Sequence, residues 1–455
     1  MKKYAPWILL IALSNCSAFA QSSVTTGHKF FAGKQKKFLH PNPHNFKVHG
    51  NLPTPHGFPL GVDTVTNFTG HFQAPGIYPV SRTAGVQHNI WEYSMVGNPP
   101  EKGGTTVFNA PVVPVTMDLR NSDGSTGVIL TAANCLGCTP AQLGQTLRLV
   151  SKPDAFISPF MQGPEFGVSD FTSSPVPTQI IDAEQKAEFG NHARPDWHTL
   201  LAPSLKTART MVINQSTDPT KPNYVFALNG DGSCCLFILV DSDAFGNKLF
   251  PPTAPPDGST VIGAAEIAGD ITTKDISTFF FPNVYLYDNG NINQCCVLGF
   301  HSGDVEPGDA TNGNRTRFYV VNYASWITPG LFDDPASCAP DNCIEDVTAH
   351  SHEVAEIFND PFVAFDGIHN VTPFWLNPAG QCQDVLEDGD VIEDLENPTV
   401  PITMNGFTYH PQTVALLPWF EFERNSSAIH NAYSYPNETA LTALSAPQPL
   451  DCSGQ

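Results

Sequence analysis

The segment 346–358 constrains the fold of this chain most, because its apolar residues recur at the spacing of an α-helix. Val354 and Ile357 can pack inward on one side of such a helix. His352 and Glu356 are four residues apart, so they project together from another face, one turn apart. A helix of this kind needs a partner layer, and the strand-like runs that precede it indicate a twisted sheet.

The spacing of His352 and Glu356 also lets both side chains reach one metal ion. Glu353 lies beside His352 but off the ligand axis, where the carboxylate of HExxH enzymes accepts a proton from the water that the metal activates. Glu356 replaces the second histidine of that pattern with a harder oxygen ligand, which still accepts zinc but makes the water less acidic. A solvated helix face without a metal is the alternative. His350 would lie on the far side of the helix, so it is a poor co-ligand.

A tetrahedral zinc site needs a third protein ligand, and the acidic stretch 384–390 is its nearest source downstream. The alternative is an acidic loop, which could bind calcium, although Ile392 stands where an EF-hand loop has an oxygen ligand. His410 is a further candidate, as a ligand or as a donor to the transition state. A lone histidine in an apolar segment is also typical of a protein core.

Runs rich in Val, Ile, Phe and Tyr begin at residue 105 and predict a sheet. They cover residues 111–119, 210–214, 224–228, 235–240, 278–287, 295–300 and 317–323. Helical patterns are fewer and cover residues 140–150, 177–189 and 344–358. Residues 21–104 are rich in Pro, Gly, His and Asn, which predicts an irregular N-terminal region. The order of the elements predicts an α+β domain over residues 105–455.

The first twenty residues fit a secretory signal peptide. Lys2 and Lys3 precede an apolar stretch over residues 7–13, and Ala20 ends a small-residue cleavage motif. The stretch is far shorter than the ~20 residues of a membrane span. We therefore expect cleavage after Ala20, no membrane span, and a secreted or periplasmic protein. A lipoprotein attached through Cys16 is the alternative.

Eleven cysteines become ten when Cys16 leaves with the signal peptide, and an even number in an exported chain favours a disulfide framework with long stapled loops. Cys135 and Cys138 form a CxxC motif, which we interpret as structural because no second pair completes a zinc site. In the doublets 234–235 and 295–296, neighbouring side chains of a strand point to opposite faces, so one member of each can bridge strands in the core.

The net charge of the chain is −22, with 22 Lys and Arg against 44 Asp and Glu. This charge disfavours nucleic acids and anionic membranes as partners, because both require cationic side chains that neutralise phosphates. The sequence also lacks a GxSxG elbow, a P-loop and a dinucleotide fingerprint, which weakens the serine hydrolase, nucleotide and redox classes.

Three segments of the chain resemble the S-H-E-[LIV]-x-E, D-P and E-[IV]-G-D pattern of exordium-like (phosphate-induced) secreted proteins. They are residues 351–356, 360–361 and 387–390. The chain is more similar still to a group of uncharacterised secreted bacterial proteins that share this core, and this similarity extends to residues 295–302 and 406–410. Neither family implies an established reaction.

His352, Glu353 and the helix around them also resemble the active-site helix of zincin metallopeptidases. This resemblance implies a zincin-like fold and a zinc site with His352 and Glu356 as ligands and Glu353 as the base. It implies Glu387 or Asp390 as the third ligand.

These features together predict an exported metal-dependent hydrolase, with a zinc peptidase acting on peptides or proteins as the first choice. The alternative is a non-catalytic secreted binding or surface-interaction protein of the same fold, in which the metal is structural or absent. The sequence does not indicate an oligomeric state.

Overall fold

The computed structural model describes residues 25–26, 62–79, 87–130, 158–161, 178–228, 236–251, 256–329, 331–332, 343–363, 365, 375–376, 382–383, 386–393, 395, 397–421 and 430–444. The signal peptide, the CxxC motif and the helix expected over residues 140–150 lie outside the described residues. Within them, the chain is a mixed α+β protein with several sheets and few helices, which confirms the predicted fold class at this level.

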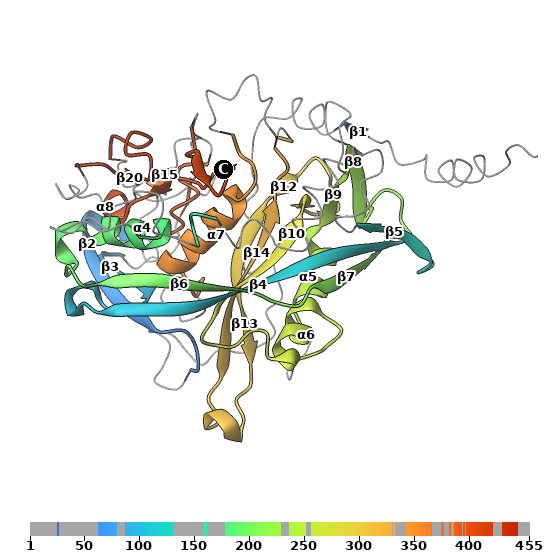
Figure 1. Cartoon of the computed structure of the whole chain (residues 1–455), viewed down its shortest axis with the longest axis horizontal. Coiled ribbons are helices and arrows are strands. Elements are labelled where there is room, and N and C mark those ends of the chain that lie inside the picture. The colour runs from blue at the N-terminus through green and yellow to red at the C-terminus, as the bar shows by residue number, and fades with distance from the viewer. Residues whose placement is uncertain are drawn as a thin grey trace, which may run out of the picture.

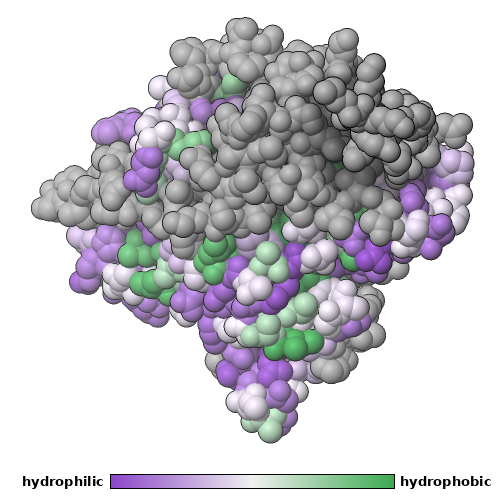
Figure 2. Space-filling view, turned by 45° about the vertical axis from the view of Figure 1, so that its right-hand side comes forward, coloured by the Kyte–Doolittle hydropathy of each residue, from purple (hydrophilic) through white to green (hydrophobic). Residues whose placement is uncertain are grey.

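Seven strands form a mixed sheet at the centre of the molecule (Figure 1). They are β4 (Thr105–Arg120), β5 (Thr126–Leu130), β6 (His198–Leu205), β7 (Arg209–Asn214), β10 (Ile276–Pro282), β13 (Gly299–Glu306) and β14 (Arg317–Trp326). Their order is β13-β14-β10-β4-β5, and β6 and β7 also pair with β4. The β13–β14 hairpin is antiparallel, whereas β10 runs parallel to both of its neighbours. This hairpin projects beyond the sheet, and the surface of the projection is largely hydrophilic (Figure 2).

A second sheet has five strands in the order β1 (Thr25–Thr26), β8 (Tyr224–Leu228), β9 (Leu236–Asp241), β11 (Val284–Tyr287) and β12 (Cys295–Val297). The run 278–287, predicted as one strand, divides between the two sheets at Asn283. Its φ of 51° interrupts the extended backbone, and asparagine tolerates this conformation better than most residues. The run 295–300 likewise divides at Leu298, between β12 and β13.

An antiparallel hairpin of β2 (Asn67–Pro79) and β3 (Gln87–Val96) lies in the N-terminal region that the sequence predicted to be irregular. That description is wrong for these two strands. Phe68 and Met95 are buried in one cluster with Trp197 and Leu386, so packing against distant segments holds the hairpin. Three further two-stranded pairs are β15 (Trp375–Leu376) with β16 (Cys382–Gln383), β17 (Ile402–Met404) with β18 (Phe407–Tyr409), and β19 (Val414–Ala415) with β20 (Ser434–Tyr435).

The described helices are α4 (Ile180–Phe189), α5 (Ser242–Leu249), α6 (Val261–Ala268), α7 (Thr348–Asn359) and α8 (Leu417–Phe420). Short 3-10 turns are η3 (Pro100–Lys102), η5 (Gly190–His192) and η6 (Ala310–Asn312). Helices α4 and α7 confirm the segments predicted over residues 177–189 and 344–358.

Helices cover both faces of the central sheet. Because the side chains of a strand alternate between its faces, neighbouring residues of β14 show which helices lie on each face. Val320 on β14 packs in one hydrophobic cluster with Ile357 of α7. Val321, the next residue, packs in another cluster with Phe245 of α5 and Ile262 of α6. The helix that carries His352 therefore lies on one face of the sheet, and α5 and α6 lie on the other.

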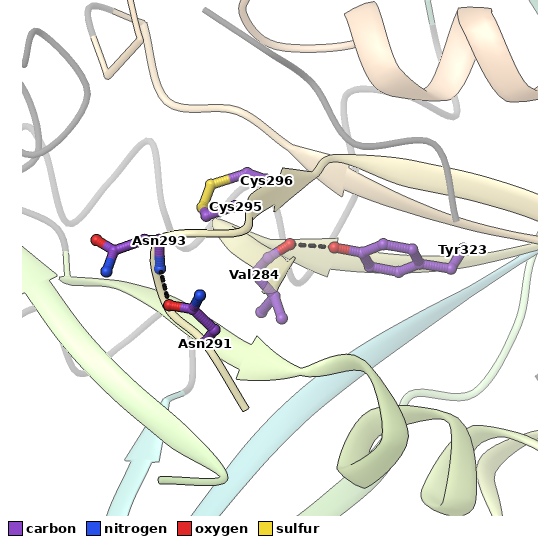
Figure 3. Close-up of a disulfide and its surroundings, with 6 residues drawn as sticks. All are labelled: Val284, Asn291, Asn293, Cys295, Cys296 and Tyr323. Carbon is purple, nitrogen blue, oxygen red and sulfur yellow. Dashed lines mark hydrogen bonds between the residues drawn. A yellow bond between two sulfur atoms is a disulfide. The ribbon is translucent and has the colours of Figure 1, made fainter. Parts of the chain in front are cut away.

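Cys295 and Cys296 at the start of β12 form a disulfide bond with each other (Figure 3). The prediction that one member of this doublet bridges strands is therefore wrong. The pairing of β12 with β11 changes register at Leu286 and Tyr287, so the doublet does not follow the regular alternation of a strand. Cys343 is also disulfide-bonded.

Among the described residues, none of the helices combines the length and the apolar composition that a membrane crossing requires.

Candidate metal centre

Helix α7 is buried along its whole length, so its polar side chains need partners inside the protein. Nε2 of His350 lies 3.1 Å from the hydroxyl of Thr278, on the sheet. Burial lowers the pKa of His350 to about 3, so its ring is neutral at pH 7. His350 is thus a core residue that faces the sheet, as its position two residues before His352 predicted.

Another face of α7 brings His352 to two carboxylates. Nε2 of His352 lies 3.0 Å from Oε1 of Glu356 and 3.5 Å from Oδ1 of Asp390. His352, the most exposed of the three, is only 8% exposed, which excludes the alternative of a solvated helix face. Of the two acids proposed as third ligand, Asp390 joins this group of ligand atoms and Glu387 does not.

Gln412 fixes the orientation of the His352 ring. Nε2 of Gln412 donates to the carbonyl of Gly389 at 2.7 Å, so its Oε1 is the atom 3.1 Å from Nδ1 of His352. An amide oxygen only accepts hydrogen bonds, so Nδ1 of His352 is the donor. Nε2 is then the ring nitrogen that faces the two carboxylates, which is the tautomer that a metal-binding histidine adopts.

His301 on β13 forms a second group with Glu353 and Glu356, which shares Glu356 with the first group, and it was not among the residues predicted from the sequence. Its Nδ1 lies 3.4 Å from Oε2 of Glu356 and 3.5 Å from Oε2 of Glu353. Its Nε2 is buried and has no hydrogen-bond partner among the described residues. The one sequence signal for His301 was its place in segment 295–302, where the chain resembles the secreted bacterial proteins.

The two separations from Nε2 of His352 suit the coordination of one small divalent ion. Ligands about 2.1 Å from a tetrahedral zinc ion stand about 3.4 Å apart. The two distances from Nε2 of His352, 3.0 Å to Glu356 and 3.5 Å to Asp390, bracket this value. Zinc accepts imidazole nitrogen and carboxylate oxygen alike. The buried histidine and acidic groups therefore have the chemistry and the spacing to hold a metal ion.

Burial and charge shift the protonation of this centre. Burial raises the pKa of Glu353 to about 7, although the nearby histidines oppose the shift. Burial disfavours the imidazolium form of His352, but the carboxylates of Glu356 and Asp390 outweigh it and hold the pKa of His352 well above its usual value. Burial also disfavours the imidazolium form of His301, but the carboxylates of Glu353 and Glu356 outweigh it and raise the pKa of His301. A cation that binds these histidines has to displace their protons.

Two glycines let neighbouring segments approach the ligands closely. A Cβ atom at Gly389 would lie 2.5 Å from Nδ1 of His352. A Cβ atom at Gly299 would lie 2.6 Å from Oε1 of Glu353. Both distances are shorter than any ordinary packing contact, so these positions require the absence of a side chain.

His410 lies in a separate group of side chains, with Glu345 and Asp346. Its Nδ1 is 2.7 Å from Oδ2 of Asp346 and 3.1 Å from Oε1 of Glu345. Its carbonyl accepts a hydrogen bond from the hydroxyl of Thr348, the first residue of α7. The structure thus places His410 beside the start of α7 and outside the group of ligand atoms around His352.

Compared with known proteins, this chain matches no protein-family model, no curated protein and no solved structure. The fold and the site define a mixed α+β protein with a buried histidine–carboxylate centre. The exordium-like and zincin resemblances stay predictions.

Proposed function

We propose that this chain is an exported metal-dependent hydrolase, a zinc peptidase with a zincin-like fold. The observation that carries the proposal is the grouping of His352, Glu356 and Asp390 around one point, with Glu353 on the adjoining helix position. The packing of α7 on a mixed sheet also supports the proposed zincin-like fold. The nitrogen ligand favours zinc over calcium at this centre, because calcium prefers oxygen ligands.

Each residue has a separate role in the proposed reaction. His352, Glu356 and Asp390 would hold the ion, and a bound ion would supply Lewis-acid chemistry for a substrate carbonyl and for water. Glu353 would accept the proton of the attacking water and return it to the leaving amine, and burial raises its pKa, which favours uptake of that proton. His301 contacts the carboxylates of Glu353 and Glu356 and acts as a positioning residue.

A second candidate function is a secreted binding or surface-interaction protein in which the metal is structural. The burial of the ligands favours it: Glu356 is 2% exposed and Asp390 is 1% exposed. A structural site closes all four coordination positions with protein ligands, whereas a catalytic site keeps one open. Another ligand would have to close the fourth position, because His301 groups with Glu353 and Glu356 and not with His352 and Asp390.

Metal content and peptide cleavage, measured on the same protein preparations, separate these functions. We expect about one zinc per chain in the wild type and in Glu353→Gln, with casein or peptide cleavage reduced by about 10²-fold or more in the variant. Asp390→Asn should lose zinc, and Glu387→Gln is the matched control that should retain it. Stoichiometric zinc with no cleavage above the level of Glu353→Gln would favour the binding protein. A wild type without zinc would contradict the hydrolase and the structural metal, and would leave a binding protein in which the metal is absent.

A further inference from the structure

Strand β13 presents its side chains alternately to the two faces of the central sheet. His301 and Val305 lie on the face that α7 covers. Asp304 and Glu306 therefore lie on the opposite face, where α5 and α6 pack. Glu266 of α6 reaches the same place, so these three acids form a group distinct from the candidate metal centre.

These three carboxylates lie close together, and most of their oxygens have no hydrogen-bond partner among the described residues. One oxygen from each lies within 4.8 Å of the others. Asp304 and Glu306 are each 2% exposed. Within the part of the chain that the structure describes, Oδ2 of Asp304, Oε2 of Glu306 and both carboxylate oxygens of Glu266 have no hydrogen-bond partner.

The nearby cation is engaged elsewhere. The guanidinium group of Arg317 lies 2.9 Å from Oδ2 of Asp309 and donates to the carbonyl of Pro307 at 3.1 Å. Arg317 attracts Glu266 and Glu306 without a direct contact, and like charges gathered in a buried place repel unless a closer cation or a proton offsets them.

The geometry points to a second cation site, formed by Glu266, Asp304 and Glu306, for a hard divalent ion of the calcium class. All three ligands supply oxygen and none supplies nitrogen or sulfur, which favours such an ion over zinc. Calcium binds oxygen at about 2.4 Å, so ligands on opposite sides of the ion stand about 4.8 Å apart. The separations within the group do not exceed this limit. Glu266 as a residue is partly exposed, but both of its carboxylate oxygens are buried with those of the other two acids.

A cation at this site would join α6 to the β13–β14 hairpin and stabilise the packing of the helix on the sheet. The competing account is a proton shared between Glu266 and Asp304, which would offset the repulsion without a metal. The cation and the shared proton predict different effects of added calcium, and of the loss of one carboxylate, on the stability of the protein.

The test uses the full chain, stripped with a chelator and reloaded with zinc, so that the candidate metal centre is occupied before calcium is added. Calcium binding is measured by titration calorimetry, and thermal unfolding is followed with calcium, with magnesium and without either ion. We expect one calcium per chain and a higher Tm with calcium. Asp304→Asn should bind calcium about tenfold more weakly or worse, because the affinity depends on the number of charged ligands.

Two variants keep the result interpretable. Glu306→Gln replaces Asp304→Asn if that protein does not fold, and it should weaken calcium binding to a similar extent. Asp243→Asn, at an exposed acid of α5, should bind calcium as the wild type does. Absence of calcium binding, or binding that neither Asp304→Asn nor Glu306→Gln weakens, would overturn the proposal. A Tm that rises in Asp304→Asn without any ion would then support the shared proton.

Discussion

His301 on β13 and Glu356 on α7 face each other where the helix meets the sheet, with 3.4 Å between Nδ1 and Oε2. The centre therefore depends on contacts between both layers of the fold. Its geometry depends on how closely α7 packs on the sheet, as well as on the spacing within the helix.

Replacement of His301 by alanine tests this dependence. The variant removes the partner of Glu353 and Glu356, so we expect zinc affinity to fall by about 10–100-fold, as for other groups that orient metal ligands. Competition with a chelator measures the affinity, and the pH profile of cleavage should shift because Glu353 loses a neighbouring charge. His430→Ala, at an exposed histidine, is the control. Wild-type zinc affinity in His301→Ala would contradict the role of His301.

Gln412 offers a test of the His352 tautomer. Gln412→Ala removes the acceptor of the Nδ1 proton, so we expect zinc to bind about 10–100-fold more weakly. Gln412→Glu keeps an acceptor in place and should restore most of the affinity, although it loses the donor to Gly389. Equal affinities in the two variants would show that the acceptor does not matter.

Gly389→Ala tests the close approach of the acidic segment to His352. The added Cβ would lie 2.5 Å from Nδ1 of His352, so the segment or the ring has to move. We expect a loss of about 1–3 kcal/mol in the free energy of unfolding, together with weaker zinc binding. Gly258→Ala is a matched control, because its Cβ would meet only Ile267, at an ordinary 3.4 Å. Urea unfolding measures the first effect, and unchanged stability and zinc affinity would contradict the prediction.

His350 predicts a pH dependence of stability. Its pKa falls from 6.5 to about 3 on folding, so between these values the unfolded chain binds a proton that the folded chain does not. The stability associated with the neutral ring is complete above pH 6.5 and is lost progressively toward pH 3. At pH 5 the loss is about 2 kcal/mol relative to pH 7.

His350→Gln removes the titrating ring while keeping a polar group near Thr278. The difference in unfolding free energy between pH 7 and pH 5 should therefore be about 2 kcal/mol smaller in the variant than in the wild type. Urea unfolding at both pH values measures it. Identical pH dependence in the two proteins would mean that His350 is not buried as a neutral ring.

Much of the secondary structure follows from local pattern. Segment 346–358 showed its helical period directly, and α7 (Thr348–Asn359) forms there. Local pattern did not predict the break within the run 278–287. Its apolar residues are continuous, so they do not reveal the turn at Asn283 that divides the run between two sheets. The β2–β3 hairpin was missed because its order depends on packing with residues far away in the sequence.

The sequence by itself determined which residues on α7 share a face, since the period of the helix places His352 and Glu356 one turn apart. Only the tertiary structure decided which distant groups meet them. Asp390 rather than Glu387 reaches His352, and His301 arrives from the sheet. His410, a further candidate, pairs with Asp346 instead. Spacing along a helix is fixed by backbone geometry. Contacts between distant segments depend instead on how the layers pack, and no local sequence pattern encodes the distance between two packed layers.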